Sequence, residues 1–251
     1  MGKVVAGNWK MHHGPVAAAA FFSRFKPRFA PDSVEILFFP PDLSLAASME
    51  TAAVPAGFGV QNIHSAKEGA FTGETSAEMA RGAGAQFALI GHSERRHVFG
   101  EGDAEVSAKA GAAVRAGLIP VVCVGELLGE RRAGHLEQVL RRQVGAIVEA
   151  VAAASRFMVA YEPVWAIGTG ETATPGDAAE AHAIVRSALG ELASAPILYG
   201  GSVKPGNALS LMSAPDVDGV LVGGASLDPD VFGRIVEAGA AAESVNPVRE
   251  P

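Results

Sequence analysis

The stretch AGNWK, residues 6–10, decides between two folds for this chain. It ends the first of eight short apolar runs that are rich in Val, Ile, Leu and Phe. Continuous rather than alternating apolarity predicts strands that are buried on both faces, as in a parallel sheet. The eight runs are residues 3–7, 34–39, 58–62, 87–91, 119–125, 157–161, 196–200 and 218–223.

Segments of helical period separate these runs. Apolar side chains recur on one face of residues 134–151 and of residues 177–192, and Phe22, Phe25 and Phe29 repeat the pattern on a shorter scale. Alternating strands and helices fit either a (β/α)8 barrel of about 250 residues or an open doubly wound sheet. A dinucleotide-binding sheet would carry G-x-G-x-x-G directly after its first strand, and AGNWK does not. We therefore predict one catalytic domain over residues 1–251, folded as a (β/α)8 barrel.

Composition narrows the functional classes. The 251 residues are 49% hydrophobic and carry a formal net charge of −7, which argues against nucleic acid or an anionic membrane as the main partner. No run reaches the ~20 apolar residues of a membrane span, and the N-terminus lacks a secretory signal, so we predict a cytoplasmic protein. The single cysteine, Cys123, lies in an apolar run, and no metal-ligand motif is present. We therefore predict neither a metal nor a structural disulfide.

Polar residues gather where the predicted strands end. Ligands of (β/α)8 barrels bind at the carboxyl ends of the strands. The residues at these positions are Asn8, Lys10, Gln61, Asn62, His92, Ser93, Glu94, Arg95, Glu126, Glu162, Gly200, Gly201, Ser202, Gly223 and Gly224.

Each of these residues also has a simpler interpretation. Lys10 shares a strand face with Asn8 if the strand continues, but a surface lysine is an equal alternative. His92 precedes a helix start in which Ser93 is the expected capping residue, and a helix N-terminus favours a neutral imidazole. A structural histidine is the alternative there. Glu162 is a catalytic base, an ion-pair partner or an exposed charge at a strand end.

Two glycine pairs indicate a phosphate site. Gly200-Gly201 and Gly223-Gly224 follow the seventh and eighth predicted strands, where barrels commonly bind phosphate. Paired glycines let an anion approach bare backbone N–H groups. One such pair is explained equally well by a tight turn, but two pairs at adjacent strand ends favour an anion site.

These motifs resemble the triosephosphate isomerase family, in order and over essentially the whole chain. The matching segments are GNWKM (7–11), GAFTGETS (69–76), IGHSERR (90–96), AYEPVWAIGTG (160–170), YGGSV (199–203) and DGVLVGGASL (218–227). The resemblance implies a cofactor-independent TIM-barrel enzyme of glycolysis and gluconeogenesis. Such an enzyme interconverts dihydroxyacetone phosphate and D-glyceraldehyde 3-phosphate through an enediol or enediolate.

The resemblance also implies residue roles. Glu162 matches the family's base, and His92 matches the electrophile that hydrogen-bonds the substrate oxygens. Lys10 matches the lysine that stabilises the enediolate and attracts the phosphate, with Asn8 as its polar companion. Glu94 matches a supporting acid that pairs with Lys10. The backbone amides implied to bind phosphate are those of Gly168, Ser202, Gly223 and Gly224.

Two loops carry further expectations from the family. Residues 163–172 resemble its lid over the active site. Residues 65–76 resemble the loop that docks into a second subunit, with Thr72 reaching the partner's active site, so a homodimer is implied. A surface turn built on glycines satisfies the local chemistry of this loop equally well. The chain departs from the family at Glu171, where lysine is common, and at His12-His13, where asparagine is common.

Two alternatives to the isomerase stay open. Another phosphate-binding barrel, such as an aldolase or a biosynthetic isomerase, would need a Schiff-base lysine or a different acid–base pair in mid-barrel. No such lysine stands out at the late strand ends, because Lys204 follows Ser202-Val203 in what is predicted to be an exposed loop. A non-catalytic phosphate-binding barrel would keep the fold without turnover. Loss of Glu162, His92 or Lys10 would favour that second alternative, and all three are present.

Overall fold

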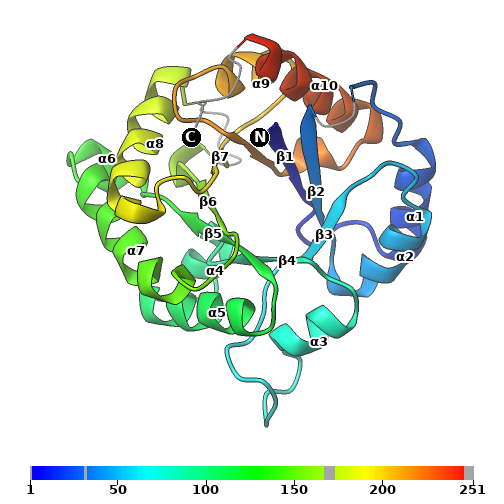
Figure 1. Cartoon of the computed structure of the whole chain (residues 1–251), viewed down its shortest axis with the longest axis horizontal. Coiled ribbons are helices and arrows are strands. Elements are labelled where there is room, and N and C mark those ends of the chain that lie inside the picture. The colour runs from blue at the N-terminus through cyan, green and yellow to red at the C-terminus, as the bar shows by residue number, and fades with distance from the viewer. Residues whose placement is uncertain (1, 31–32, 167–172, 246–251) are drawn as a thin grey trace.

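The apolar runs form the strands of one closed barrel, which confirms the predicted (β/α)8 fold. The computed structural model describes residues 2–30, 33–166 and 173–245. Each strand pairs in parallel with the next along the chain, and the eighth closes on the first (Figure 1). The strands are β1 (Lys3–Asn8), β2 (Val34–Phe39), β3 (Gly57–Val60), β4 (Phe87–Ile90), β5 (Ile119–Val124), β6 (Met158–Tyr161), β7 (Ile197–Tyr199) and β8 (Gly219–Val222).

Both faces of these strands are buried, which explains their continuous apolarity. Successive side chains of a strand point to opposite faces, so Val4 and Ala6 enter the barrel interior while Val5 faces the helices. The interior is filled by Val4, Ala6, Leu37, Phe39, Phe87, Leu89, Val121, Cys123, Met158, Ala160, Leu198 and Leu221. The barrel is therefore a packed core, and a ligand has room only at its ends.

The helices surround the strands as an outer ring (Figure 1). Helix α7 packs against α5, α8 and β5, and the predicted apolar face is buried at Leu136, Leu140, Val144, Ile147 and Val151. The α-helices are α1 (Pro15–Arg24), α2 (Leu45–Thr51), α3 (Ala77–Gly82), α4 (Ser93–His97), α5 (Asp103–Arg115), α6 (Leu128–Arg132), α7 (Leu136–Val151), α8 (Pro175–Leu189), α9 (Pro205–Met212) and α10 (Pro229–Val245). Short 3₁₀ turns are η1 (Asp42–Ser44), η2 (Val164–Ala166), η3 (Gly190–Leu192) and η4 (Gly224–Ser226). Among the helices of these described segments, none is long and apolar enough to cross a membrane.

The first helix is shorter than its aromatic spacing suggested. Helix α1 ends at Arg24, and Phe25 is already extended, with ψ of 103°. Pro27 accounts for this end, because the residue before a proline is disfavoured in the helical region. Phe25 still packs into the core, where its ring stacks on Phe21 at 5.5 Å. The apolar spacing therefore located the buried Phe22 and Phe25, but Phe29 is only partly buried and the helix is shorter than the spacing predicts.

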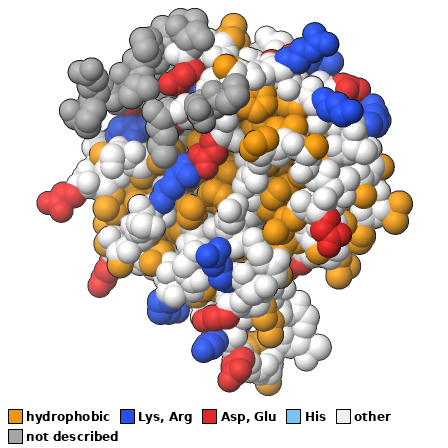
Figure 2. All heavy atoms as spheres, turned by 45° about the vertical axis from the view of Figure 1, so that its right-hand side comes forward, with side chains coloured by type: hydrophobic (Ala, Val, Ile, Leu, Met, Phe, Trp, Pro, Cys, Tyr) orange, Lys and Arg blue, Asp and Glu red, His pale blue; other side chains and the backbone are white. Residues whose placement is uncertain are grey.

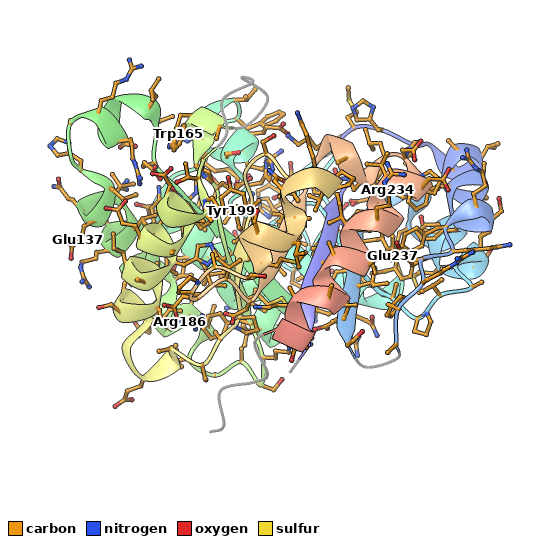
Figure 3. All side chains as sticks on the ribbon, turned by 90° about the horizontal axis from the view of Figure 1, so that it is seen from above. Glu137, Trp165, Arg186, Tyr199, Arg234 and Glu237 are labelled. Atoms are coloured by element: carbon orange, nitrogen blue, oxygen red, sulfur yellow. The ribbon has the colours of Figure 1, made fainter. Side chains whose placement is uncertain are left out.

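The two ends of the barrel differ in function. In the side view, Trp165 lies at the upper end and Arg186 near the lower end (Figure 3). Trp165 follows β6, so its end is the one at which the strands finish. Arg186 joins α8 to the segment before β8, because its side chain hydrogen-bonds Asp216 and Asp218. Arg186 therefore has a structural contact near the lower end, and the upper end is where a barrel binds ligands.

Helix α8 contains a histidine that is buried without charge. His182 Nδ1 donates to the Asp216 carbonyl at 2.9 Å, and the ring packs against Tyr161. Burial lowers the pKa of His182 from 6.5 to about 4. The unfolded chain therefore takes up a proton between these two pH values, whereas the folded chain does not. Above pH 6.5 this histidine does not change the free energy of unfolding. As the pH falls from 6.5 toward 4, protonation of the unfolded chain lowers that free energy.

We expect the His182→Asn variant to unfold with a weaker pH dependence than the wild type. The wild type should lose about 1.4 kcal/mol per pH unit through this histidine between pH 6.5 and 4, or about 3 kcal/mol in total. Urea unfolding at fixed protein concentration and at several pH values measures the difference. His135→Asn, at an exposed position, is the matched control. Parallel pH profiles for the wild type and His182→Asn would contradict the buried neutral histidine.

Candidate active site

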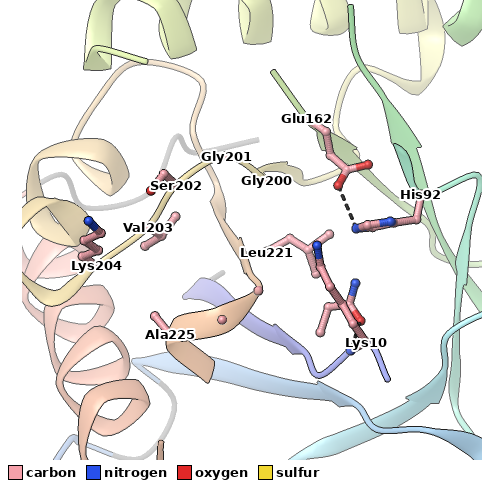
Figure 4. Close-up of a pocket in the computed structure, with 13 residues that line it drawn as sticks. Lys10, His92, Glu162, Gly200, Gly201, Ser202, Val203, Lys204, Leu221 and Ala225 are labelled. Carbon is pink, nitrogen blue, oxygen red and sulfur yellow. Dashed lines mark hydrogen bonds and ion pairs between the residues drawn. The ribbon is translucent and has the colours of Figure 1, made fainter. Parts of the chain in front are cut away.

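One pocket at the carboxyl ends of the strands brings most of the predicted site residues together. Its volume is about 280 Å³. His92 and Glu162 face each other on one side, and Ser202 and Lys204 lie across from them (Figure 4). The residues that line it are Asn8, Lys10, His92, Glu162, Gly200, Gly201, Ser202, Val203, Lys204, Leu221, Gly223, Gly224 and Ala225. Within the described parts of the chain, no three His, Cys, Asp or Glu side chains are grouped so that they could hold a metal ion.

Lys10 enters the pocket from a left-handed turn, and not from a continued strand. Strand β1 ends at Asn8, and Lys10 has φ of 50°, so the expectation that alternation along the strand orients both residues is wrong. Asn8 Oδ1 instead accepts the Lys10 backbone N–H at 3.0 Å. Gln61 Nε2 donates to the carbonyl oxygens of Lys10 and Phe39, both at 2.8 Å. Side-chain hydrogen bonds from two strand ends therefore stabilise an unfavourable backbone conformation.

Lys10 forms an ion pair with the residue predicted to support it. Its Nζ lies 2.6 Å from Glu94 Oε1, and both side chains are partly exposed. An exposed pair of this kind contributes little stability, with a typical value of about 0–1 kcal/mol. The pair orients the lysine along the pocket wall without removing it from solvent.

His92 itself caps helix α4, so the prediction of Ser93 as the capping residue is wrong by one position. His92 Nδ1 accepts the backbone N–H of Glu94 at 3.2 Å. Because Nδ1 is used as an acceptor, the proton of the neutral ring lies on Nε2. That nitrogen is 3.0 Å from Glu162 Oε1 (Figure 4). The imidazole is thus fixed with its N–H directed into the pocket.

Glu162 is almost completely buried at the end of β6. Its side chain is 2% exposed, and Oε2 accepts the Ser93 backbone N–H at 2.8 Å. Two glycines make room for it. A side chain at Gly125 would lie 1.8 Å from the Glu162 carbonyl oxygen, and one at Gly200 would lie 2.9 Å from the Glu162 side chain. The exposed-charge interpretation of Glu162 is therefore excluded.

Burial and hydrogen bonding set the ionisation of this pair. Burial raises the pKa of Glu162, but His92, the Ser93 N–H and Lys10 outweigh it, and the net pKa lies below its ordinary value. Burial lowers the pKa of His92, whereas the Glu162 carboxylate raises it, with a net increase. Protonation of Nδ1 would break the cap on Glu94, so we assign an ionised Glu162 beside a neutral His92. Movement of Glu162 away from the ring would also remove the charge that raises the pKa of His92.

Glu126 is a buried carboxylate next to the site, and the sequence predicted it only as a polar residue at a strand end. Glu126 is 0% exposed, and its Oε1 accepts hydrogen bonds from Tyr161 Oη at 3.0 Å and Trp165 Nε1 at 2.8 Å. Its backbone carbonyl accepts the N–H of Val164. Burial raises the pKa of Glu126. This residue fixes the chain that leaves β6 directly after Glu162. No local motif identifies it, because Glu126 and Trp165 are distant in sequence.

Three of the four predicted phosphate residues, Ser202, Gly223 and Gly224, line the same pocket as Glu162. Ser202 follows β7, while Gly223 and Gly224 begin the η4 turn after β8. A side chain at Gly223 would lie 3.6 Å from Lys10 Cε, so the lysine and this turn are neighbours. Lys204 is exposed, as predicted, although it also lines the pocket. One lysine and two glycine-rich turns therefore surround the same space.

The structure describes the predicted docking loop in full and the predicted lid only in part. Residues 65–76 project from the barrel between β3 and α3 (Figure 1), and Thr72 is exposed in this loop, outside the pocket of its own chain. The base of the loop is fixed by a bridge between His64 and Ser76. In the predicted lid, residues 167–172 lie outside the described residues, and so do Gly168 and Glu171.

Comparison with known proteins identifies the family. A family model described as triosephosphate isomerase matches residues 3–239. The triosephosphate isomerase of Symbiobacterium thermophilum is 47% identical over 251 residues, covering 96% of this chain and 98% of the relative. Those of Solibacter usitatus and Thiobacillus denitrificans are also 47% identical, and they cover 93% and 95% of this chain and 98% of each relative.

The chain belongs to the triosephosphate isomerase family. The match runs from β1 into α10, so it spans the whole barrel and every site residue from Asn8 to Gly224. The resemblance seen in the sequence motifs is confirmed. The roles of the individual residues stay predictions, for which the pocket supplies the geometry.

Proposed function

We propose that this protein interconverts dihydroxyacetone phosphate and D-glyceraldehyde 3-phosphate, without a cofactor, through an enediol or enediolate. Membership of the triosephosphate isomerase family supports this reaction, which belongs to glycolysis and gluconeogenesis. The observation that carries the proposal is the buried Glu162 carboxylate, 3.0 Å from His92 Nε2 in a pocket that also holds Lys10. A base, a neutral hydrogen-bond donor and a fixed cation are the groups that this proton transfer needs.

Glu162 would act as the base. With its pKa below the ordinary value, the carboxylate is ionised at neutral pH and ready to accept a proton. It would take the proton from the carbon beside the substrate carbonyl and return it to the neighbouring carbon. The charge that develops on oxygen would be stabilised by His92 Nε2–H and Lys10 Nζ. Water exclusion strengthens both interactions and protects an intermediate that can eliminate phosphate.

Substrate binding would rearrange the pocket before this step. His92 Nε2 and the Ser93 N–H both contact Glu162. One N–H cannot serve the carboxylate and the substrate oxygen equally well, so the substrate would displace Glu162 from His92. The freed carboxylate would gain basicity, because the hydrogen bonds that lower its pKa are lost.

The phosphate group would bind on the wall opposite Glu162. We assign its contacts to the backbone N–H groups of Ser202, Gly223 and Gly224, with Lys10 supplying the charge. Gly168 would add a further N–H if residues 163–172 act as a lid. This arrangement would hold the reacting carbons between Glu162 and His92, because the phosphate fixes the far end of the substrate.

An assay in deuterated water tests the reaction and its mechanism together. We expect turnover in both directions in the presence of a chelator, with solvent deuterium incorporated on carbon, because a proton held by a carboxylate exchanges with water. Borohydride added with substrate should not inactivate the enzyme, since no Schiff base is formed. Borohydride inactivation would indicate an aldolase-type lysine. Phosphate binding without turnover would indicate the non-catalytic alternative.

We also propose a cytoplasmic homodimer that forms through residues 65–76. The family resemblance supports it, and so do large apolar side chains that the single chain exposes. Met11 is 94% exposed and Leu43 is 87% exposed, and Phe71, Met79, Val98 and Phe99 are exposed as well. Figure 2, in which the right-hand side of Figure 1 is turned forward, shows apolar side chains at many places on the surface of that view. Thr72 would then enter the partner's pocket.

Phe71→Glu is expected to shift the protein from dimer to monomer. A buried charge without a partner would oppose association at the loop that we place in the interface. Sedimentation velocity over a range of protein concentrations gives the mass. Leu209→Glu, on an exposed position of α9, is the matched control and should leave the mass unchanged. A dimer of equal strength in both variants would exclude this loop from the interface.

A further inference from the structure

We infer that His13 and Trp9 are positioning residues that hold the phosphate-binding turn against the loop that carries Lys10. The inference rests on the proposed isomerase function, and it goes beyond it because neither side chain lines the pocket. Both side chains come from the loop after β1, and both bind consecutive backbone carbonyls after β8.

The two hydrogen bonds form a clamp behind the η4 turn. Trp9 Nε1 donates to the Ser226 carbonyl at 3.0 Å, and His13 Nε2 lies 2.9 Å from the Leu227 carbonyl. A carbonyl oxygen only accepts, so His13 Nε2 is the donor. These carbonyls belong to the end of the turn whose beginning, Gly223 and Gly224, lines the pocket. Fixing the back of so short a turn also fixes the direction of the N–H groups at its front.

The donors are themselves held rigidly. The Trp9 side chain is fully buried among Phe21, Phe22 and Phe38, and its backbone N–H donates to the Phe39 carbonyl. The His13 ring packs edge-on against Trp9, with ring centroids 4.8 Å apart. Because each ring limits the other, the two donors cannot move independently of the barrel.

The backbone at His13 has an unfavourable left-handed conformation, and the hydrogen bonds of the clamp offset its free-energy cost. His13 has φ of 61°, which is unfavourable for a residue with a side chain. Its carbonyl accepts the Ser44 hydroxyl at 2.7 Å. Lys10, three residues earlier, has φ of 50°. Two left-handed residues therefore bend the loop so that Lys10 faces the pocket and His13 returns to the Leu227 carbonyl.

The consequence is a fixed spacing between the two halves of the phosphate site. Lys10 supplies the charge on one side, and the Gly223-Gly224 turn supplies N–H groups on the other. His13 joins these two loops directly. It should therefore contribute to binding of the phosphate group and have little influence on proton transfer at Glu162.

The His13→Phe variant tests this role, because it keeps an aromatic ring over Trp9 and removes the donor. Loss of one hydrogen bond should raise KM for glyceraldehyde 3-phosphate, and Ki for inorganic phosphate, by about threefold to tenfold. Catalysis at saturation should change by less than twofold. The slow isomerisation of unphosphorylated D-glyceraldehyde should be unaffected, which a general loss of structure would not allow.

Two further variants keep the test decisive. His13→Gln retains a donor of similar reach and should restore KM and Ki. His13→Asn tolerates the left-handed backbone but is too short to reach Leu227, so it should behave as His13→Phe does, even if that variant folds poorly. His135→Phe, at an exposed position on the N-terminal side of α7, is the control.

Each result has a definite meaning. Unchanged KM and Ki in folded His13→Phe and His13→Asn would overturn the inference, as would equal losses with and without the substrate phosphate. Equal behaviour of the Gln and Phe variants would overturn the role of the hydrogen bond. Absence of turnover in the wild type is a different outcome, because it would refute the proposed function itself.

Discussion

Glu162→Gln should lower kcat by about 10²–10⁴-fold, the range typical for removal of a general base. Glutamine has nearly the same shape, and its carbonyl oxygen can still accept the Ser93 N–H that holds Glu162. The amide cannot accept a proton from carbon, so folding and substrate binding should persist while the chemical step is lost. We expect no other single substitution in the pocket to lower turnover as much.

Steady-state kinetics and binding of inorganic phosphate separate these two effects. Ki for phosphate should stay within a few-fold of the wild-type value, and incorporation of solvent deuterium should fall in parallel with kcat. Glu191→Gln, which changes an exposed carboxylate in η3, is the control for loss of a negative charge. Near-equal turnover in Glu162→Gln and the wild type would refute the assignment of the base.

Lys10→Met should lower kcat/KM by about 10²–10³-fold, the loss typical when one preorganised stabilising group is removed. Methionine retains most of the aliphatic length but not the charge. Two effects should combine, because Lys10 is placed to stabilise both the enediolate oxygen and the phosphate. We therefore expect kcat to fall and KM to rise, in contrast to Glu162→Gln.

The same variant separates the charge from the ion pair with Glu94. Glu94→Gln removes the carboxylate partner but leaves the lysine, so its effect should be much smaller than that of Lys10→Met. Lys26→Met, at an exposed position after α1, is the control for net charge. A loss in Glu94→Gln as large as in Lys10→Met would mean that the pair, and not the lysine alone, is required.

Strand and helix patterns predicted the barrel correctly, because a strand that is buried on both faces is apolar at successive positions. The run at residues 119–125 is apolar throughout, since Val121 and Cys123 fill the barrel while Val122 and Val124 face the helices. Residues 134–151 are apolar on one face only, as α7 requires. Both patterns are local, so they do not depend on which distant residues come into contact.

Predictions that depended on the direction of a single side chain succeeded less often. Alternation would place Asn8 and Lys10 on one face only if the strand continued, but the strand ends at Asn8 and a left-handed turn carries Lys10 into the pocket. The helix start at Ser93 was expected to be capped by its hydroxyl, whereas the His92 ring caps it. In both cases a hydrogen bond between side chain and backbone decided the geometry, and such bonds leave no periodic pattern.

Local patterns along the chain were sufficient to predict the barrel, the family and the polar residues at one end. They were sufficient because burial is periodic and because the family motifs are contiguous segments. The three-dimensional contacts were needed to show that Glu162 is buried against Ser93, that His92 Nε2 faces Glu162, and that Trp9 and His13 contact the turn after β8. These contacts join residues up to 217 positions apart. The contacts of Trp9 and His13 arise only when barrel closure brings β8 beside β1, and Glu162 meets His92 and Ser93 only when the ends of β6 and β4 share one barrel rim. No local stretch of the chain can specify them.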